Sequence, residues 1–154
     1  NGAASGLGAD TALACDFIIA SPWANFSWSY IHRGIIPDGG GMYFLPRRVG
    51  LPRAKELIFT GPRIDATTAE RWGFVNAVVA PDELSARGEA LAAEIATAAP
   101  LAVGMAKRVI DGLADIDRGL LLEGWAQSQL FSSEDFIEGA QAFMLRRRPD
   151  FKGR

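Results

Sequence analysis

The sequence contains one cysteine and one histidine, and these two shortages exclude several kinds of site. A single Cys15 cannot form a disulfide within the chain. Its apolar neighbours predict a small buried side chain, and we expect a reducing, cytoplasmic compartment. Two such residues are too few for the usual protein zinc site, so we expect no metal. His32 alone would have to activate any serine or cysteine nucleophile, and we interpret it instead as a surface or packing residue.

Long apolar runs and a strong excess of one charge are also missing. No apolar run approaches the roughly 20 residues that span a bilayer, so we expect no membrane partner. The formal net charge of -2 does not favour nucleic-acid binding. No Gly-Lys-Ser or Gly-Lys-Thr phosphate loop occurs, and Thr11 stands where a dinucleotide fingerprint starting at Gly6 requires glycine. These absences remove the main support for ATP or NAD as a cofactor.

Hydrophobic residues make up 49% of the 154 residues, enough to bury a core. Against this background, two glycine-rich turns carry acids. The turn at 6–10 ends in Asp10, and the loop at 36–41 contains Asp38 followed by three glycines. Each turn places a carboxylate beside backbone without side-chain cover, so a ligand could approach amide N–H groups and an acid together. These turns are the candidate functional stretches.

The periodicity of apolar residues predicts two regions of different character. Up to about residue 98, short apolar strands at 17–20, 25–28 and 74–79 alternate with helices at 42–49, 51–59, 65–73 and 81–98. Beyond Pro100 only helices are expected, at 102–113, 118–131 and 135–148, the last with arginines in its final turn. We therefore predict an α/β portion over 1–98 and a helical region over 99–154.

Several short motifs follow one another in a fixed order: Asn1-Gly2, the turn at 6–10, Cys15-Asp16, the Pro-Asp-Gly-Gly loop at 37–40, Pro46-Arg47, Trp72-Gly73-Phe74-Val75 and Arg147-Arg148-Pro149-Asp150-Phe151. Each motif is weak alone. In this order and spacing they resemble the crotonase, or enoyl-CoA hydratase/isomerase, superfamily over almost the whole chain.

The resemblance implies an α/β fold in which ββα turns form a spiral, with a C-terminal helical region that assembles homotrimers or hexamers. The chain begins at Asn1 and not at Met, and the resemblance implies that earlier turns of the spiral are absent from it. We therefore expect an incomplete spiral over 1–98 and an oligomerisation region over 99–154.

The resemblance also implies an acyl-CoA thioester substrate, with coenzyme A as part of the substrate and no separate cofactor. Two backbone N–H groups would hold the thioester oxyanion. One is placed at Leu7, between Gly6 and Gly8, and an amide at a helix start suits developing negative charge. The other is expected in a segment before Asn1, which this chain does not contain.

The acids indicate which reaction to expect. Hydratases of this family carry two glutamates, and the corresponding positions hold Asp10 and Tyr30. Asp38 matches the aspartate of dienoyl-CoA isomerases, and its Pro-Asp-x-Gly-Gly setting resembles isomerases of the phenylacetate pathway. We therefore predict an acyl-CoA double-bond isomerase with Asp38 as the proton-transfer base. Asp10 would be a second acid/base or would order the site, and Tyr30 would position substrate or water.

Further substrate contacts are expected from Gly6, Gly8, Pro37 and Gly39 in the two turns, and from Phe151 and Lys152 near the end of the chain. Other interpretations stay open at this point. Asp10 could merely stabilise a helix start, and Asp38 could be an ordinary turn residue. An enoyl-CoA hydratase, an acyl-CoA hydrolase of the same superfamily, or an inactive oligomerising fragment would also fit these residues.

Overall fold

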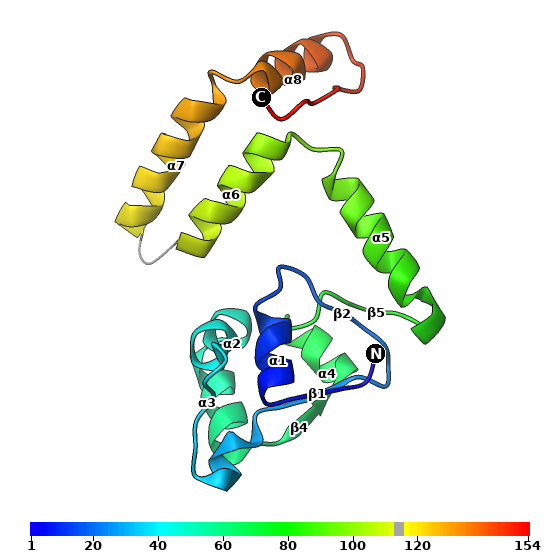
Figure 1. The fold of residues 1–154 in the computed structure, drawn as a ribbon, viewed down its shortest axis with the longest axis vertical. Coiled ribbons are helices and arrows are strands. Elements are labelled where there is room, and N and C mark those ends of the chain that lie inside the picture. Colours follow the sequence, from blue (N-terminus) through cyan, green and yellow to red (C-terminus); the bar gives the residue numbers. More distant parts are fainter. Residues whose placement is uncertain (113–115) are drawn as a thin grey trace. The chain divides into compact units, whose positions relative to one another are not determined.

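A computed structural model of the chain describes residues 1–112 and 116–154; the side chains of 113–120 and of residue 123 lie outside that description. Contacts divide the chain into two compact units, Asn1–Glu89 and Ala90–Arg154. The division falls inside α5 (Leu84–Ile95), ahead of the predicted change of character at residue 98. Strands occur in the first unit, and the described part of the second unit is helical (Figure 1).

The first unit contains two small sheets. In the larger one, β3 (Asn25–Ser27) lies between β1 (Ala3–Ser5), which is parallel to it, and β4 (Arg63–Asp65), which is antiparallel. In the smaller one, β2 (Ile19–Ala20) pairs in parallel with β5 (Ala77–Val78). The strands predicted at 17–20 and 25–28 are confirmed in shortened form, whereas β1 and β4 were not predicted.

The strand predicted at 74–79 was wrong over its first half. Phe74 and Val75 lie in the turn that follows α4 (Ala66–Arg71), where both their N–H groups donate to the carbonyl of Ala69, at 2.9 and 3.2 Å. This turn begins at Gly73, whose φ of 77° is favourable only for glycine. The turn, and not a strand, therefore carries these two apolar side chains into the core.

Helices surround the sheets of the first unit. The predictions at 42–49, 51–59 and 65–73 are confirmed to within one or two residues. The helices and 3-10 turns of this unit are α1 (Leu7–Leu13), η1 (Ser29–Arg33), α2 (Gly41–Val49), α3 (Leu51–Thr60), α4, η2 (Pro81–Glu83) and the start of α5. Because α1 ends at Leu13, Cys15 lies in the turn beyond it and is exposed, so the prediction that Cys15 is buried was wrong.

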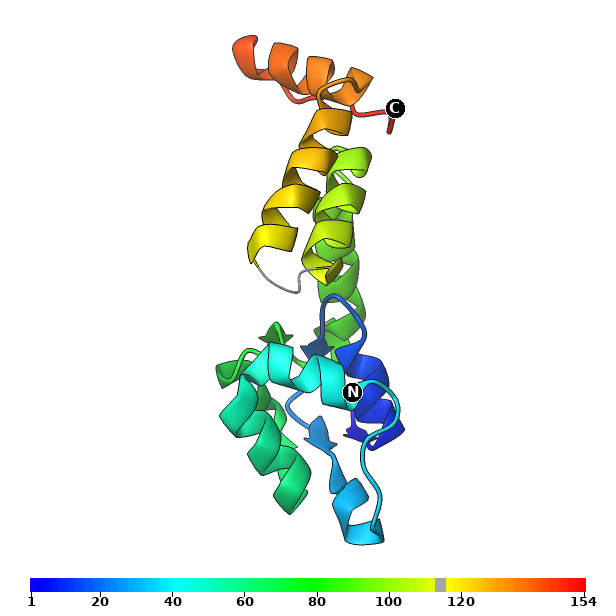
Figure 2. The same cartoon turned by 90° about the vertical axis from the view of Figure 1, so that its left-hand side faces the viewer.

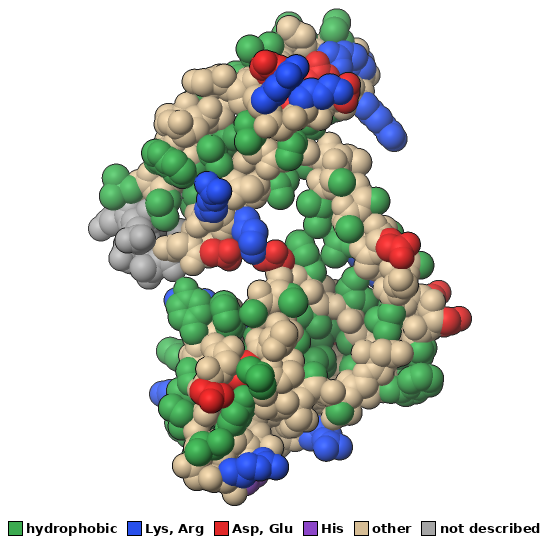
Figure 3. Space-filling view, viewed as in Figure 1, with side chains coloured by type: hydrophobic (Ala, Val, Ile, Leu, Met, Phe, Trp, Pro, Cys, Tyr) green, Lys and Arg blue, Asp and Glu red, His purple; other side chains and the backbone are tan. Residues whose placement is uncertain are grey.

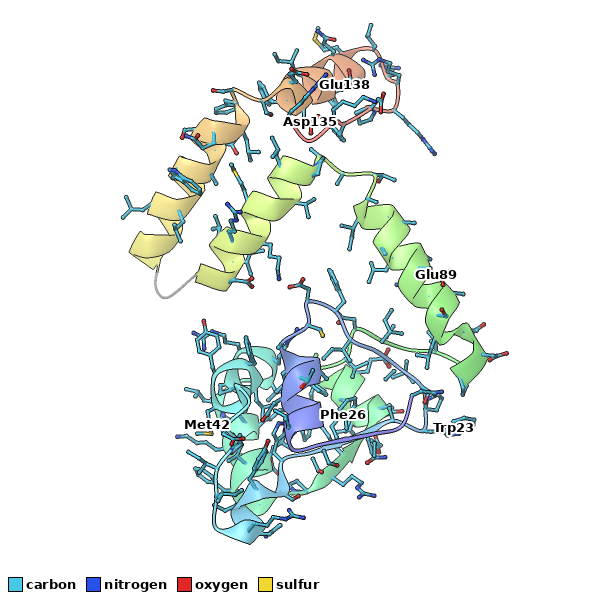
Figure 4. All side chains as sticks on the ribbon, in the orientation of Figure 1. Trp23, Phe26, Met42, Glu89, Asp135 and Glu138 are labelled. Carbon is cyan, nitrogen blue, oxygen red and sulfur yellow. The ribbon has the colours of Figure 1, made fainter. Side chains whose placement is uncertain are left out.

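Three aromatic rings organise the core of the first unit. Phe74 is fully buried and meets the edges of Phe26 and Trp28, with ring centroids 4.6 and 5.7 Å away. Phe26 lies in β3 and is labelled in Figure 4. Leu13 and Leu45 are also buried, so α1 and α2 contribute to the same cluster. The candidate active site is built on this core.

The second unit contains α6 (Pro100–Gly112), α7 (Ile116–Leu130) and α8 (Glu134–Met144). Helices α6 and α7 pack side by side (Figures 1 and 2). The predicted end of the first of these helices, at residue 113, lies outside the described residues. Helix α8 does not continue to Arg148 as predicted, because Arg146 adopts a left-handed conformation with a φ of 51°.

Among the described residues, no single helix is both long and apolar enough to cross a bilayer. Only the bent pair Pro81–Ile95 and Pro100–Gly112 has that length and composition, and only when its two helices are counted together.

Candidate active site

The turn at Gly6 leads β1 into α1 and exposes the start of this helix. Gly6 has a φ of 56°, and its own N–H donates to the carbonyl of Ser27 at 3.0 Å. The N–H groups of Leu7 and Gly8 belong to the first helical turn, where no intrahelical carbonyl can accept them. Gly6 has no side chain that could cap them. The predicted oxyanion donor at Leu7 thus lies at an uncapped helix start, which attracts negative charge.

The loop at 37–41 packs directly on this helix start. A Cβ added at Gly39 would lie 2.5 Å from Leu7 Cδ1 and 2.9 Å from Asp10 Cβ. A Cβ added at Gly41 would overlap the Asp10 carboxylate. Only glycine permits so close an approach. The structure therefore brings together two turns that are separated by some thirty residues in the sequence.

Asp10 lies at the centre of this contact and is fully buried. The indole Nε1–H of Trp28 donates to Oδ1 at 2.9 Å, and the hydroxyl of Tyr30 donates to Oδ2 at 2.9 Å. The hydrogen bond from Trp28 to Asp10 was not predicted. The signal available in the sequence was general: a buried indole N–H needs an acceptor.

Tyr30 interacts with both acids of the site. Its pKa is raised to about 12, with partial burial as the largest cause; the hydrogen bond to Asp10 and the charges of Asp10 and Asp38 contribute in the same direction. The phenol therefore stays protonated at physiological pH and acts as a hydrogen-bond donor. Its ring also lies over Gly6, where an added Cβ would be 3.6 Å from the hydroxyl oxygen.

Asp38 differs from Asp10 in its surroundings. Pro37, which precedes it, is buried, whereas Asp38 itself is exposed. In the part of the chain that the structure describes, no hydrogen bond or ion pair engages its carboxylate. The site thus contains one enclosed carboxylate, which is bonded to the Tyr30 hydroxyl, and one open carboxylate, whose charge also acts on this phenol.

Arg48, in the last turn of α2, binds the far end of α1. Its Nη2 donates to the carbonyls of Leu13, Cys15 and Asp16, at 3.5 Å for Leu13 and 3.3 Å for Asp16. A guanidinium here satisfies carbonyls that the helix leaves without partners and complements the negative end of the helix dipole.

The two substrate contacts predicted near the end of the chain belong to the second unit. Phe151 is half-buried beside Gly139 and lines a pocket of about 370 Å³ together with Leu101 and Phe136. The ammonium group of Lys152 pairs with Asp150 at 2.6 Å. Leu7 belongs to the first unit, so contacts of Phe151 and Lys152 with a substrate bound near Leu7 stay a prediction.

The residues after α8 fold back onto this helix. The buried carboxylate of Asp135 accepts the N–H groups of Lys152 and Gly153, at 2.7 and 2.9 Å. One turn further along, Glu138 accepts Arg147 Nη2 and the N–H of Asp150, both at 2.8 Å. Figure 4 labels both acids on α8, and Figure 3 shows acidic and basic side chains interspersed over this part of the unit.

The hydrogen bonds from Arg147 are the main reason why the pKa of Glu138 is lowered to about 2; the N–H of Asp150 and the charge of Lys152 act in the same direction. Arg147 is therefore occupied by an ion pair within its own unit. No group of three or more histidine, cysteine, aspartate or glutamate residues among those described could hold a metal ion.

An α/β fold with an uncapped helix start beside an open carboxylate defines a protein that can bind a developing oxyanion and move a proton nearby. The family model described as enoyl-CoA hydratase/isomerase matches residues 1–154. The chain belongs to this family and has its crotonase-like fold, so the resemblance seen in the sequence is confirmed.

Relatives of this chain carry hydratase and dehydratase names. It is 41% identical to the short-chain-enoyl-CoA hydratase of Clostridium acetobutylicum, covering 100% of this chain and 60% of that protein. It is 39% identical to the carnitinyl-CoA dehydratase of Proteus mirabilis, covering 100% of this chain and 61% of the relative. The crystal structure of enoyl-CoA hydratase from Bacillus anthracis matches with a TM-score of 0.95 and 40% identity, over 100% of this chain and 60% of that one. The chain thus spans about three fifths of the length of these proteins.

Proposed function

We propose that the protein carrying this chain is an acyl-CoA double-bond isomerase, nearest in chemistry to the dienoyl-CoA and phenylacetate-pathway isomerases. The observation that carries the proposal is the difference between its two acids. Asp10 is enclosed and engaged by two donors, whereas Asp38 is exposed on a loop that packs against Leu7. One open carboxylate beside an oxyanion donor suffices for a proton shift along an enolisable chain.

In the proposed reaction, the thioester carbonyl accepts a hydrogen bond from Leu7 N–H. Asp38 removes a proton from the acyl chain, so that a C–H bond breaks, an O–H bond forms on Asp38 and the electron pair moves into the enolate. The double bond then shifts as Asp38 returns the proton two carbons away. A positioned general base contributes about 10² to 10⁴ in rate, and one oxyanion donor about 10² to 10³.

Hydration of a 2-enoyl-CoA is the second candidate. The names of the relatives at 39 and 41% identity favour it, since they refer to adding or removing water. In this case the neutral Tyr30 hydroxyl would hold the water beside Asp38. Tyr30 itself cannot replace an ionised glutamate in this reaction.

Substrate trials with the full-length protein separate the two candidates. Isomerisation predicts that 3-enoyl-CoA is converted to 2-enoyl-CoA and that no 3-hydroxyacyl-CoA accumulates, as followed by chromatography. Asp38→Asn should lower kcat for this conversion by at least about a hundredfold without changing the unfolding temperature. Asp82→Asn is the matched control, because Asp82 also follows a proline and is exposed in the first unit. Wild-type activity in Asp38→Asn would refute Asp38 as the base.

We also propose that coenzyme A enters only as part of the substrate, without a separate cofactor, and that the protein works in the cytoplasm as a homotrimer or hexamer. Apolar side chains at the end of α8 support assembly: Phe143, Met144 and Leu145 are 86, 82 and 68% exposed. Such a patch is usually covered by a partner. Light scattering of the full-length protein measures its oligomeric state.

A further inference from the structure

We propose that Asp10 is a positioning residue: its buried carboxylate fixes the loop that carries Asp38 and takes no part in moving the proton. The inference rests on the proposed function, in which Asp38 is the base. It assigns different roles to two acids that look equivalent in the sequence, because each belongs to a glycine-rich turn.

The first support is the hydrogen bonding of Asp10. Each carboxylate oxygen accepts one donor at 2.9 Å, Oδ1 from Trp28 and Oδ2 from Tyr30, and the residue has no exposed surface. A group that carries a proton to a substrate carbon must reach that carbon. Asp10 is instead buried and held by the side chains of Trp28, which follows β3, and Tyr30, in η1.

The second support is the contact between Asp10 and the loop. Gly39 and Gly41 approach the Asp10 side chain so closely that a Cβ at Gly39 would lie 3.0 Å from Oδ2, and one at Gly41 would lie 3.0 Å from Cγ. Asp38 is the residue directly before this contact, and the buried Pro37 anchors its other side. The position of the Asp38 carboxylate is therefore set by how Gly39 and Gly41 rest on Asp10.

An asparagine at position 10 separates positioning from proton transfer. Because the Trp28 indole is a donor only, the amide oxygen must face Trp28, and the amide NH₂ then faces Tyr30, whose oxygen can accept it. Both contacts survive with one of them reversed. The amide cannot carry a proton, so any catalysis that remains does not pass through residue 10.

The experiment compares Asp10→Asn with Asp38→Asn in the full-length protein, using double-bond isomerisation as the assay. We expect Asp10→Asn to keep kcat within about tenfold of the wild type with KM unchanged, while Asp38→Asn loses at least about a hundredfold. A loss in Asp10→Asn as large as that in Asp38→Asn, at an unchanged unfolding temperature, would overturn the inference. If Asp38→Asn keeps full activity, the proposed function fails, and the Asp10→Asn result still reports on Asp10.

A second pair of variants decides the matter if Asp10→Asn folds poorly. Gly41→Ala leaves both acids in place but pushes the loop away from Asp10, and we expect kcat per folded molecule to fall by about a hundredfold, as for a misplacement of about 1 Å. In Asp10→Ala/Gly41→Ala, the new methyl group occupies the space of the lost carboxylate, and kcat should recover at least about tenfold over Gly41→Ala. A double variant as slow as Asp38→Asn would contradict the positioning role.

Discussion

Replacing Asp135 should detach the end of the chain from α8. Asp135 is 3% exposed, and its carboxylate accepts two backbone N–H groups, those of Lys152 and Gly153. The backbone N–H of Asp135 donates to the carbonyl of Arg154 at 3.1 Å. In Asp135→Ala the two amides lose their acceptor, whereas the backbone bond to Arg154 needs no side chain. Of the three bonds between Asp135 and the docked segment, one is therefore left.

The size of the effect follows from these contacts. A hydrogen bond to a charged acceptor contributes about 1.5 to 3 kcal/mol, and two are lost. The freed amides regain water when the segment lifts off, so we expect unfolding of the second unit to become easier by about 3 kcal/mol. Asp135→Asn should lower the free energy of unfolding by about half as much. Its amide oxygen can still accept one of the two N–H groups, whereas its NH₂ group faces the other and cannot accept it.

Hydrogen exchange measures the detachment of the segment, and urea unfolding measures the loss of stability. The amides of Lys152 and Gly153 should lose their protection in Asp135→Ala before the core amides do. Glu134→Gln is the matched control, because Glu134 lies in the same first turn but forms only an exposed ion pair with Arg154, and it should cost less than about 1 kcal/mol. Unchanged protection of both amides in Asp135→Ala would refute the reasoning.

Two further predictions concern the packing and the charge of the chain. The Glu138 pKa is about 2 when folded and 4.5 ordinarily, so its bonds to Arg147 stabilise the fold above about pH 4.5 and this contribution disappears as the pH falls toward 2. The difference in unfolding free energy between the wild type and Glu138→Gln should shrink over that range in urea titrations; a constant difference would contradict the ion pair. Phe74→Ala removes a fully buried ring that touches Phe26 and Trp28 and should cost about 3 to 5 kcal/mol by thermal unfolding, against less for Phe74→Leu. An equal loss in both variants would show that ring contacts are not what matters there.

Elements bounded by local signals could be predicted from the sequence. Helices α2 and α3 are delimited by Gly50 and Gly61, with φ values of 79 and 59°, and their apolar spacing is clear. Strands β1 and β4 have three residues each and owe their form to pairing with β3, a contact that no local pattern encodes. The same limit explains the error at 74–79, where an apolar run serves a turn that inserts into the core.

The candidate site also has a part that could be predicted from the sequence and a part that could not. The turns around Leu7 and Asp38 could be found because glycine and acid at fixed spacing form recognisable motifs. The partners of Asp10 could not, since Trp28 and Tyr30 lie 18 and 20 residues away and become neighbours only when β3 pairs with β1. Burial, which distinguishes Asp10 from Asp38, is likewise a product of tertiary packing.

The two contacts between α1 and α2 have a mechanical consequence. Gly39 and Gly41, at the start of α2, contact α1 near Leu7. Arg48, in the last turn of α2, binds carbonyls at the C-terminal end of α1. Contacts with α2 therefore hold α1 at both of its ends. Contacts within the chain therefore hold the start of α1, with Leu7, against the loop that carries Asp38.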